Sequence, residues 1–143
     1  MRFRLDRVQV WAGEVEDRAG GVASKLAALA NAGANLQFVF TQRRPDPPGG
    51  GIIFVAPISG ADQQKASRAA GLHEVHDPVV LRVEGDNEAG LAHRLTQQWA
   101  LAGISFQGLT MAVMNGRFVG YAMFDTVADS NKAATILADL GTH

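Results

Sequence analysis

An internal repeat is the feature that most restricts the folds open to this chain. The segment Asp17–Ala23 resembles Asp86–Ala92 at an offset of 69 residues, with the Asp, the last Gly and the Ala recurring. Farther along, Ala32–Leu36 matches Ala102–Phe106 after an insertion of one residue. The repeat therefore predicts two small domains of the same fold in a chain of 143 residues.

Residue periodicity gives the order of elements in the first copy. Alternation of Val8 and Val10 with their polar or aromatic neighbours indicates a strand, and Leu26 and Leu29 lie on one face of a helix that Gly33 ends. A Ser-x-x-Asp sequence beginning at Ser59 is typical of a helix start. The predicted strands lie near 8–11, 36–40, 52–58 and 72–76, and the predicted helices at 22–33 and 59–70.

The second copy repeats this order and lacks its last strand. Asn115-Gly116 predicts a tight hairpin, because both positions of such a turn need positive φ. Asp129 or Ser130 is expected to cap the last helix. The N-terminal run from Phe3 is one candidate to cover the sheet edge that the missing strand leaves. The predicted strands are 79–83, 104–113 and 117–127, and the predicted helices are 91–103 and 129–140.

The order βαββαβ is typical of a ferredoxin-like unit, in which two helices pack on one face of an antiparallel sheet. We therefore predict an α+β fold with two tandem ferredoxin-like domains, at residues 1–77 and 78–143. The boundary is placed at Asp77-Pro78, because the residue before a proline is disfavoured in helix.

The loops and helix starts of both copies resemble the ACT domain, whose pattern is Asp-x-Pro-Gly-x-Leu-Ala, a helix, and then Gly-x-Asn-Ile. The first copy has Asp17–Ala23 and Gly33–Leu36, and the second has Asp86–Ala92 and Gly103–Phe106. This resemblance implies a regulatory module that pairs its sheets or helices and binds amino acids at interdomain or dimer interfaces. The sequence departs from the pattern where Ala19 replaces the proline, Ala89 a loop glycine and Ser105 the asparagine.

The two loops are candidate sites for such a ligand. A helix N-terminus offers N–H groups to a carboxylate, and Gly20-Gly21 permits close approach of the backbone. Asp17 can accept a hydrogen bond from an ammonium group, although it can equally act as a helix cap and the glycines as a simple turn. The predicted binding residues are Asp17, Arg18, Ala19, Gly20, Gly21 and Asn35 in the first copy, and Asp86, Gly90 and Ser105 in the second.

Two tryptophans bear on packing and assembly. Trp11 is expected on the strand face opposite Val8 and Val10, where it would form an interdomain or dimer contact. Trp99 lies on the apolar stripe of its helix and is expected in the core. Because each domain is small, we expect a homo-oligomer, specifically a dimer, with a separate protein partner as the target of regulation.

Composition argues against several other classes. Residues 1–76 carry nine basic and seven acidic groups and residues 77–143 carry four and seven, so neither half favours nucleic acid. The chain has no cysteine, no apolar run long enough for a membrane and no leader-like start, so we expect a cytoplasmic protein. His73 and His76 are poorly spaced for a metal on a strand. No cofactor is implied.

We expect a protein that is not an enzyme, because the common hydrolase, metalloprotease and Walker motifs do not occur. Two alternatives stay open: a purely structural interaction module, and an acylphosphatase-like hydrolase that would place Arg18 beside Asn35. The run Val119–Phe124 partly matches an RNA-recognition motif but lacks its basic residue and second aromatic residue.

Overall fold

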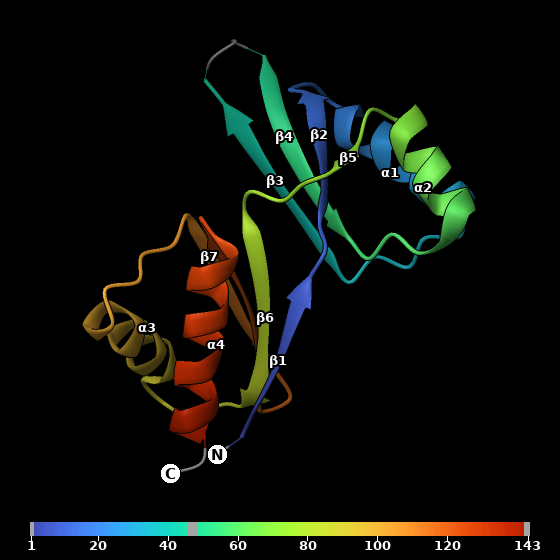
Figure 1. Ribbon diagram of the computed structural model, residues 1–143. Coiled ribbons are helices and arrows are strands. Elements are labelled where there is room, and N and C mark those ends of the chain that lie inside the picture. Colours follow the sequence, from blue (N-terminus) through green and yellow to red (C-terminus); the bar gives the residue numbers. More distant parts are fainter. Residues whose placement is uncertain (1, 46–48, 142–143) are drawn as a thin grey trace. The chain divides into compact units, whose positions relative to one another are not determined.

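The computed structural model of the chain describes residues 2–45 and 49–141 (Figure 1). Contacts divide the chain into two compact units: unit 1, made of Met1–Val8 and His76–His143, and unit 2, made of Gln9–Val75. Each unit is a four-stranded antiparallel sheet with two helices on one face (Figure 1). This confirms the predicted α+β fold with two ferredoxin-like domains.

Unit 2 follows the predicted element order closely. Its sheet has the order β3-β4-β2-β5. Gly33 has a φ of 83°, and the N–H of Ala34 donates to the carbonyl of Leu29, so the first helix ends in the expected left-handed turn. The elements are β2 (Trp11–Glu16), α1 (Gly21–Asn31), β3 (Phe38–Arg44), β4 (Gly50–Ala56), α2 (Gly60–Ala69) and β5 (His73–Glu74).

Unit 1 has the sheet order β1-β6-β8-β7. Asn115 and Gly116 have φ values of 53° and 74°, which confirms the predicted tight hairpin. The last helix starts earlier than predicted, because the Thr126 hydroxyl, and not Asp129 or Ser130, accepts the N–H of Asp129 at 3.0 Å. The elements are β1 (Phe3–Val8), β6 (Val79–Asp86), α3 (Leu91–Leu101), β7 (Gly108–Met114), β8 (Arg117–Phe124) and α4 (Val127–Gly141).

The first strand of the chain completes the sheet of unit 1. All six residues of β1 pair with β6, in the register Phe3↔Gly85 to Val8↔Val80. The predicted division at 77/78 assigned these residues to the first domain, whereas their backbone groups pair with the second. The strand predicted near 8–11 is in fact two strands, β1 and β2, separated by Gln9 and Val10.

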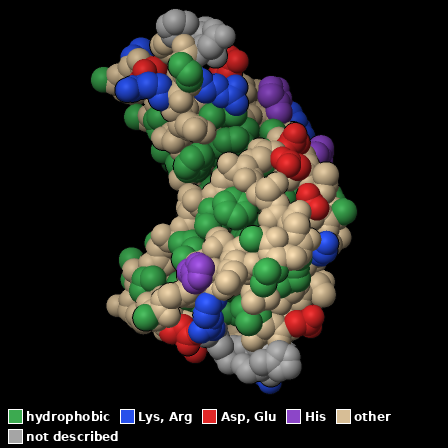
Figure 2. All heavy atoms as spheres, turned by 90° about the vertical axis from the view of Figure 1, so that its left-hand side faces the viewer, with side chains coloured by type: hydrophobic (Ala, Val, Ile, Leu, Met, Phe, Trp, Pro, Cys, Tyr) green, Lys and Arg blue, Asp and Glu red, His purple; other side chains and the backbone are tan. Residues whose placement is uncertain are grey.

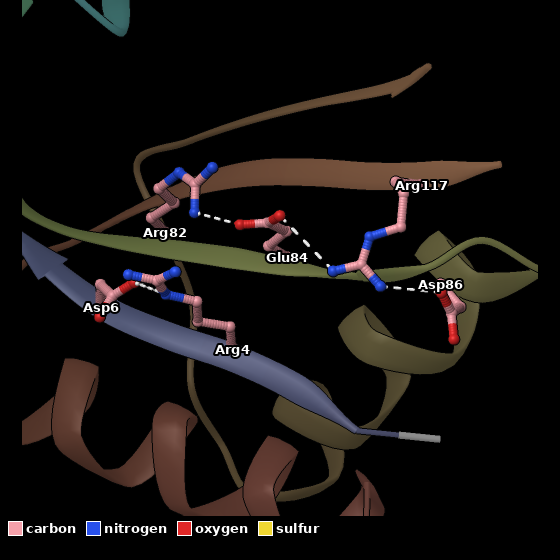
Figure 3. Close-up of polar contacts among 6 residues, drawn as sticks. All are labelled: Arg4, Asp6, Arg82, Glu84, Asp86 and Arg117. Atoms are coloured by element: carbon pink, nitrogen blue, oxygen red, sulfur yellow. Dashed lines mark hydrogen bonds and ion pairs between the residues drawn. The ribbon is translucent and has the colours of Figure 1, made fainter. Parts of the chain in front are cut away.

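Charge complementarity supports this register. Arg4 lies directly opposite Glu84, and Asp6 lies opposite Arg82. Opposite charges in such cross-strand positions stabilise a sheet, whereas a shift by one residue would turn β1 over. Arg82 and Arg117 flank Glu84 at 2.6 Å and 3.5 Å (Figure 3). The hydrogen bond from Arg82 holds the pKa of the Glu84 carboxyl below its ordinary value.

Each unit has its own apolar core between its sheet and its helices. In unit 1, Trp99 is 1% exposed and its indole N–H donates to the carbonyl of Ala133, which confirms the predicted core position. In unit 2, Trp11 is 2% exposed and packs with Leu29 and Leu72. The expectation that Trp11 forms an interdomain or dimer contact is therefore wrong, because β2 turns this side chain toward its own helices.

The two cores differ in size. The buried members in unit 1 are Leu81, Val83, Leu91, Leu95, Trp99, Ile104, Phe118, Ala122, Phe124, Ala133 and Leu137. Those in unit 2 are Trp11, Val15, Leu29, Ile53, Val55 and Leu72. None of the helices in the described ranges 2–45 and 49–141 is both long and apolar enough to cross a membrane.

Phe3→Ala tests the assignment of β1 to unit 1. The Phe3 ring packs edge-on against Phe118 at 5.8 Å between centroids and is only partly buried, so we expect a loss of about 2 kcal/mol, below the ~3–5 kcal/mol of a fully buried Phe. Hydrogen exchange should show lower protection of amides in unit 1 and unchanged protection in unit 2. The exposed Arg7→Ala is the control. Equal losses in both units would contradict the assignment.

Candidate functional site

The loop between β2 and α1 contains five of the predicted binding residues. Gly20 has a φ of 85° and precedes the helix, where no side chain forms a capping hydrogen bond. The N–H of Gly21 donates to the carbonyl of Arg18 at 3.1 Å, and that of Ser24 donates to Gly20 at 3.0 Å. The left-handed glycine therefore shapes the helix start, and the alternative that Asp17 caps the helix is not what the structure shows.

Gly21 is required for the close approach of α1 to β2. A Cβ atom at this position would overlap the carbonyl oxygen of Glu16. Glycine thus allows the helix to begin directly against the end of the strand, with Gly21 itself buried. This accounts for the loop sequence in structural terms and also brings the first turn of α1 beside the edge of β2.

Ion pairs hold the charged side chains of this loop. The Arg43 guanidinium lies 2.7 Å from the Asp17 carboxylate, and Arg18 donates to Glu16. The hydrogen bond from Arg18 lowers the pKa of the Glu16 carboxyl. Figure 2 shows basic and acidic side chains gathered at the end of unit 2 where β3 and β4 turn. Arg44, at the end of β3, adds a further exposed basic side chain.

The second loop follows the first in a register that differs from the expected one. Gly20 and Gly90 both have left-handed φ and both precede an 11-residue helix, so the structural offset is 70 residues and not 69. No insertion separates the two copies, and Ala89 corresponds to Ala19. The counterpart of Asp86 is therefore Glu16, at the end of its strand. Asp86 accepts a hydrogen bond from Arg117 at 2.8 Å.

Asn35 and Ser105 lie at the far ends of α1 and α3 from their loops. An 11-residue helix is about 16 Å long, so Asn35 and the Gly20-Gly21 turn do not line one site within unit 2. The same holds for Ser105 and Gly90 in unit 1. This separation also argues against the acylphosphatase-like alternative, which needs Arg18 and Asn35 side by side.

A groove of about 860 Å³ runs along the outer edge of β2 in unit 2, below the first turn of α1. It includes Arg18 and Gly21 from the predicted set. The remaining lining residues were not predicted, and glycines are prominent among them. They are Ala12, Gly13, Glu14, Val15, Glu16, Ser24, Lys25, Arg44, Gly49, Gly50, Gly51, Ile52, Gly71, His73 and Val75.

Comparison of the units explains why the groove forms in unit 2. On the helices, Gly21 and Lys25 take the positions of Leu91 and Leu95, which are buried in unit 1. On the sheets, Gly51 pairs with Val15 where Phe118 pairs with Gly85. The position of six-residue β1 is taken by the two-residue β5.

The described part of unit 1 leaves only about 10 Å³ between its helices and sheet, beside Gly120 and Trp99. The side chains at the equivalent positions fill the space that remains open in unit 2. A groove of this kind therefore exists in one copy of the repeat and is occupied by the core in the other.

Lys25 is the groove residue that sequence reasoning most clearly missed. Its ammonium group donates to the carbonyl of Ala70 at the end of α2, and it lies near Gly71. A lysine on the inner side of a helix, where the other copy has leucine, was a signal that only the 70-residue register could reveal. The 69-residue register aligned Lys25 with Arg94 instead.

No protein-family model and no curated protein sequence matches the chain. Solved structures do match it. Protein BT0572 from Bacteroides thetaiotaomicron is 12% identical with a TM-score of 0.76, over 95% of this chain and 90% of that one. The regulatory subunit of aspartate kinase from Thermus thermophilus is 14% identical with a TM-score of 0.67, over 100% and 98%.

Aspartokinase III from E. coli, solved with aspartate and ADP, is 10% identical with a TM-score of 0.63. It matches 99% of this chain, which spans 33% of that longer enzyme. At these identities the likeness concerns the fold. The chain has the tandem ferredoxin-like fold of aspartate kinase regulatory subunits, which is the ACT-type fold that its loop sequences predicted.

Proposed function

We propose that this protein is a non-catalytic regulatory protein that binds a small metabolite, an amino acid, in the groove of unit 2. The observation that carries the proposal is the position of this groove, beside the first turn of α1 and the Asp17–Gly21 loop. Solved structures of the same fold that are described as regulatory subunits support a regulatory role. The effect of binding would be passed to a separate protein partner.

The groove offers complementary groups for both ends of a free amino acid. The Arg18 and Lys25 cations and the N–H groups of the first turn of α1 suit the carboxylate. The carboxylates of Glu14 and Glu16 suit the ammonium group. Glycine backbone and the Val15 side chain leave room for the rest of the ligand. We assign Asp17, Ala19 and Gly20 to shaping this loop.

The proposal places one ligand in each chain. In unit 1 the counterpart loop, with Asp86 and Gly90, adjoins a filled core. We do not assign Asn35 or Ser105 to the groove, because each lies about one helix length from its loop.

Lys25→Leu tests the groove directly. Leucine stands at the equivalent position 95 in unit 1, so the variant should fold, remove a cation and fill the groove. An amino acid that binds only the folded wild type should stabilise it by ~2.7 kcal/mol at 100 times Kd, seen as a rise in melting temperature. The variant should show no such rise with any of the twenty amino acids.

Lys65→Leu, at an exposed position on α2, is the matched control and should respond as the wild type does. A folded Lys25→Leu protein that keeps the full thermal shift would place the ligand elsewhere. If no amino acid at millimolar concentration raises the melting temperature of the wild type, the structural interaction module becomes the better reading of this chain.

We further propose a homodimer that forms through β7. This strand is the last in its sheet, and its seven residues carry no charge, whereas charged residues normally protect such edges. An antiparallel pairing of two copies centred on Met111 places Leu109 beside Val113 of the partner subunit. Such a pairing would continue the sheet and extend the apolar face across the seam.

Val113→Lys tests the dimer. Val113 is 54% exposed, so the substitution should leave the unit folded while placing two lysines in the seam. Sedimentation should then show a shift from dimer toward monomer. Val127→Lys, at a residue 45% exposed on α4, is the control and should leave the dimer intact. A monomeric wild type at high micromolar concentration would contradict the proposal.

A further inference from the structure

The outer edge of β2 is only partly covered within unit 2. The short β5 pairs with Trp11 and Ala12. Gly71 and Leu72 then lie against Gly13, where a Cβ atom would overlap them. Among residues 2–45 and 49–141, no strand pairs with Glu14–Glu16 on this side, and these residues line the groove. Three residues of strand edge are therefore open to an incoming chain.

Unit 1 shows what a covered edge looks like in the same fold. At the structural offset of 70 residues, Glu14–Glu16 corresponds to Glu84–Asp86. There Arg4 lies opposite Glu84 and Phe3 lies opposite Gly85 (Figure 3). Arg2 continues the alternation on the same face as Arg4. The segment that covers this edge thus reads basic, aromatic, basic.

Unit 2 retains the receiving groups for such a segment. Glu14 is exposed and has no ion-pair partner among the described residues, and Glu16 pairs with Arg18. Leu72 is buried beside Gly13, at the place where Leu5 lies opposite Val83 in unit 1. What unit 2 lacks is a counterpart of Phe3 and its two flanking arginines.

The space for an apolar side chain is also present. Phe3 packs against Phe118 in unit 1. The residue equivalent to Phe118 is Gly51, which faces Val15 across the strands. Gly21 and the stem of Lys25 border the same groove. A large side chain placed opposite Val15 would therefore enter open volume.

We propose that the Glu14–Glu16 edge of β2 binds an extended segment of a partner protein, with a large apolar residue between two basic ones. The segment adds as an antiparallel strand, so its backbone bonds to β2 and its apolar side chain enters the groove. Its basic side chains lie opposite Glu14 and Glu16. The inference rests on the open strand edge and not on the metabolite proposed for the groove.

The test uses the full chain and the capped peptide Gly-Arg-Phe-Arg-Gly. Amide chemical shifts in a nitrogen-15 spectrum should change at Glu14, Val15 and Glu16 as the peptide is added up to 5 mM. The peptide Gly-Arg-Gly-Arg-Gly should bind more weakly, because it lacks the apolar side chain. Glu14→Gln should weaken binding roughly two- to fivefold, as expected for one cross-strand charge pair.

A charge exchange separates recognition from loss of folding. The double variant Glu14→Arg, Glu16→Arg should lose the basic peptide and gain Gly-Glu-Phe-Glu-Gly, which the wild type should not bind. Asp62→Asn, at an exposed acid on α2, should bind as the wild type does. Shifts outside the β2 edge, equal binding of the acidic and basic peptides, or no shift at 5 mM would overturn the proposal.

Discussion

Backbone pairing at the sheet edges is the constraint on which the rest of this structure depends. A ferredoxin-like sheet needs a fourth strand beside its first, because an uncovered edge leaves backbone donors and acceptors without partners and one side of the core open. The two units meet this need differently. Unit 1 takes a complete strand from residues 3–8, and unit 2 forms only the two-residue β5. The difference decides which unit has a full core and which has a groove.

The side chains follow the same division. Where β1 completes the sheet, Leu91, Leu95 and Phe118 fill the space beneath the helices. Where the edge is short, Gly21, Lys25 and Gly51 stand at the matching positions. A large apolar side chain in the incomplete unit would have no strand to cover it. The repeat thus keeps one backbone arrangement and assigns packing to one copy and an accessible groove to the other.

The sequence predicted the fold well because the signals that define it are local. Gly33 ends a helix and Asn115-Gly116 makes a hairpin through their own backbone preferences, which no distant contact has to supply. The site was predicted less well. Asn35 was grouped with Gly20 by family pattern, although a helix separates them. Trp11 was placed on the wrong face because β1 and β2 were read as one strand.

The groove itself was hidden for a related reason. Its lining comes from β2, α1, β4 and the segment around Gly71, so it exists only once these elements are packed together. Small residues lining a groove carry no pattern along the chain. Only the comparison of equivalent positions, such as Lys25 with Leu95, distinguishes the two copies, and that comparison needs the helix boundaries that fix the offset at 70.

The insertion of unit 2 between β1 and β6 has a consequence for the order of folding. For β1 to meet β6, the 67 residues of Gln9–Val75 must form a closed loop, which costs roughly 4 kcal/mol of chain entropy if that loop is unstructured. Once unit 2 has folded, its own ends are together, with the N–H of Val75 donating to the carbonyl of Val10 at 3.2 Å. Early folding of unit 2 therefore makes the loop closure for unit 1 nearly free, and the inserted domain acts as a template for its host.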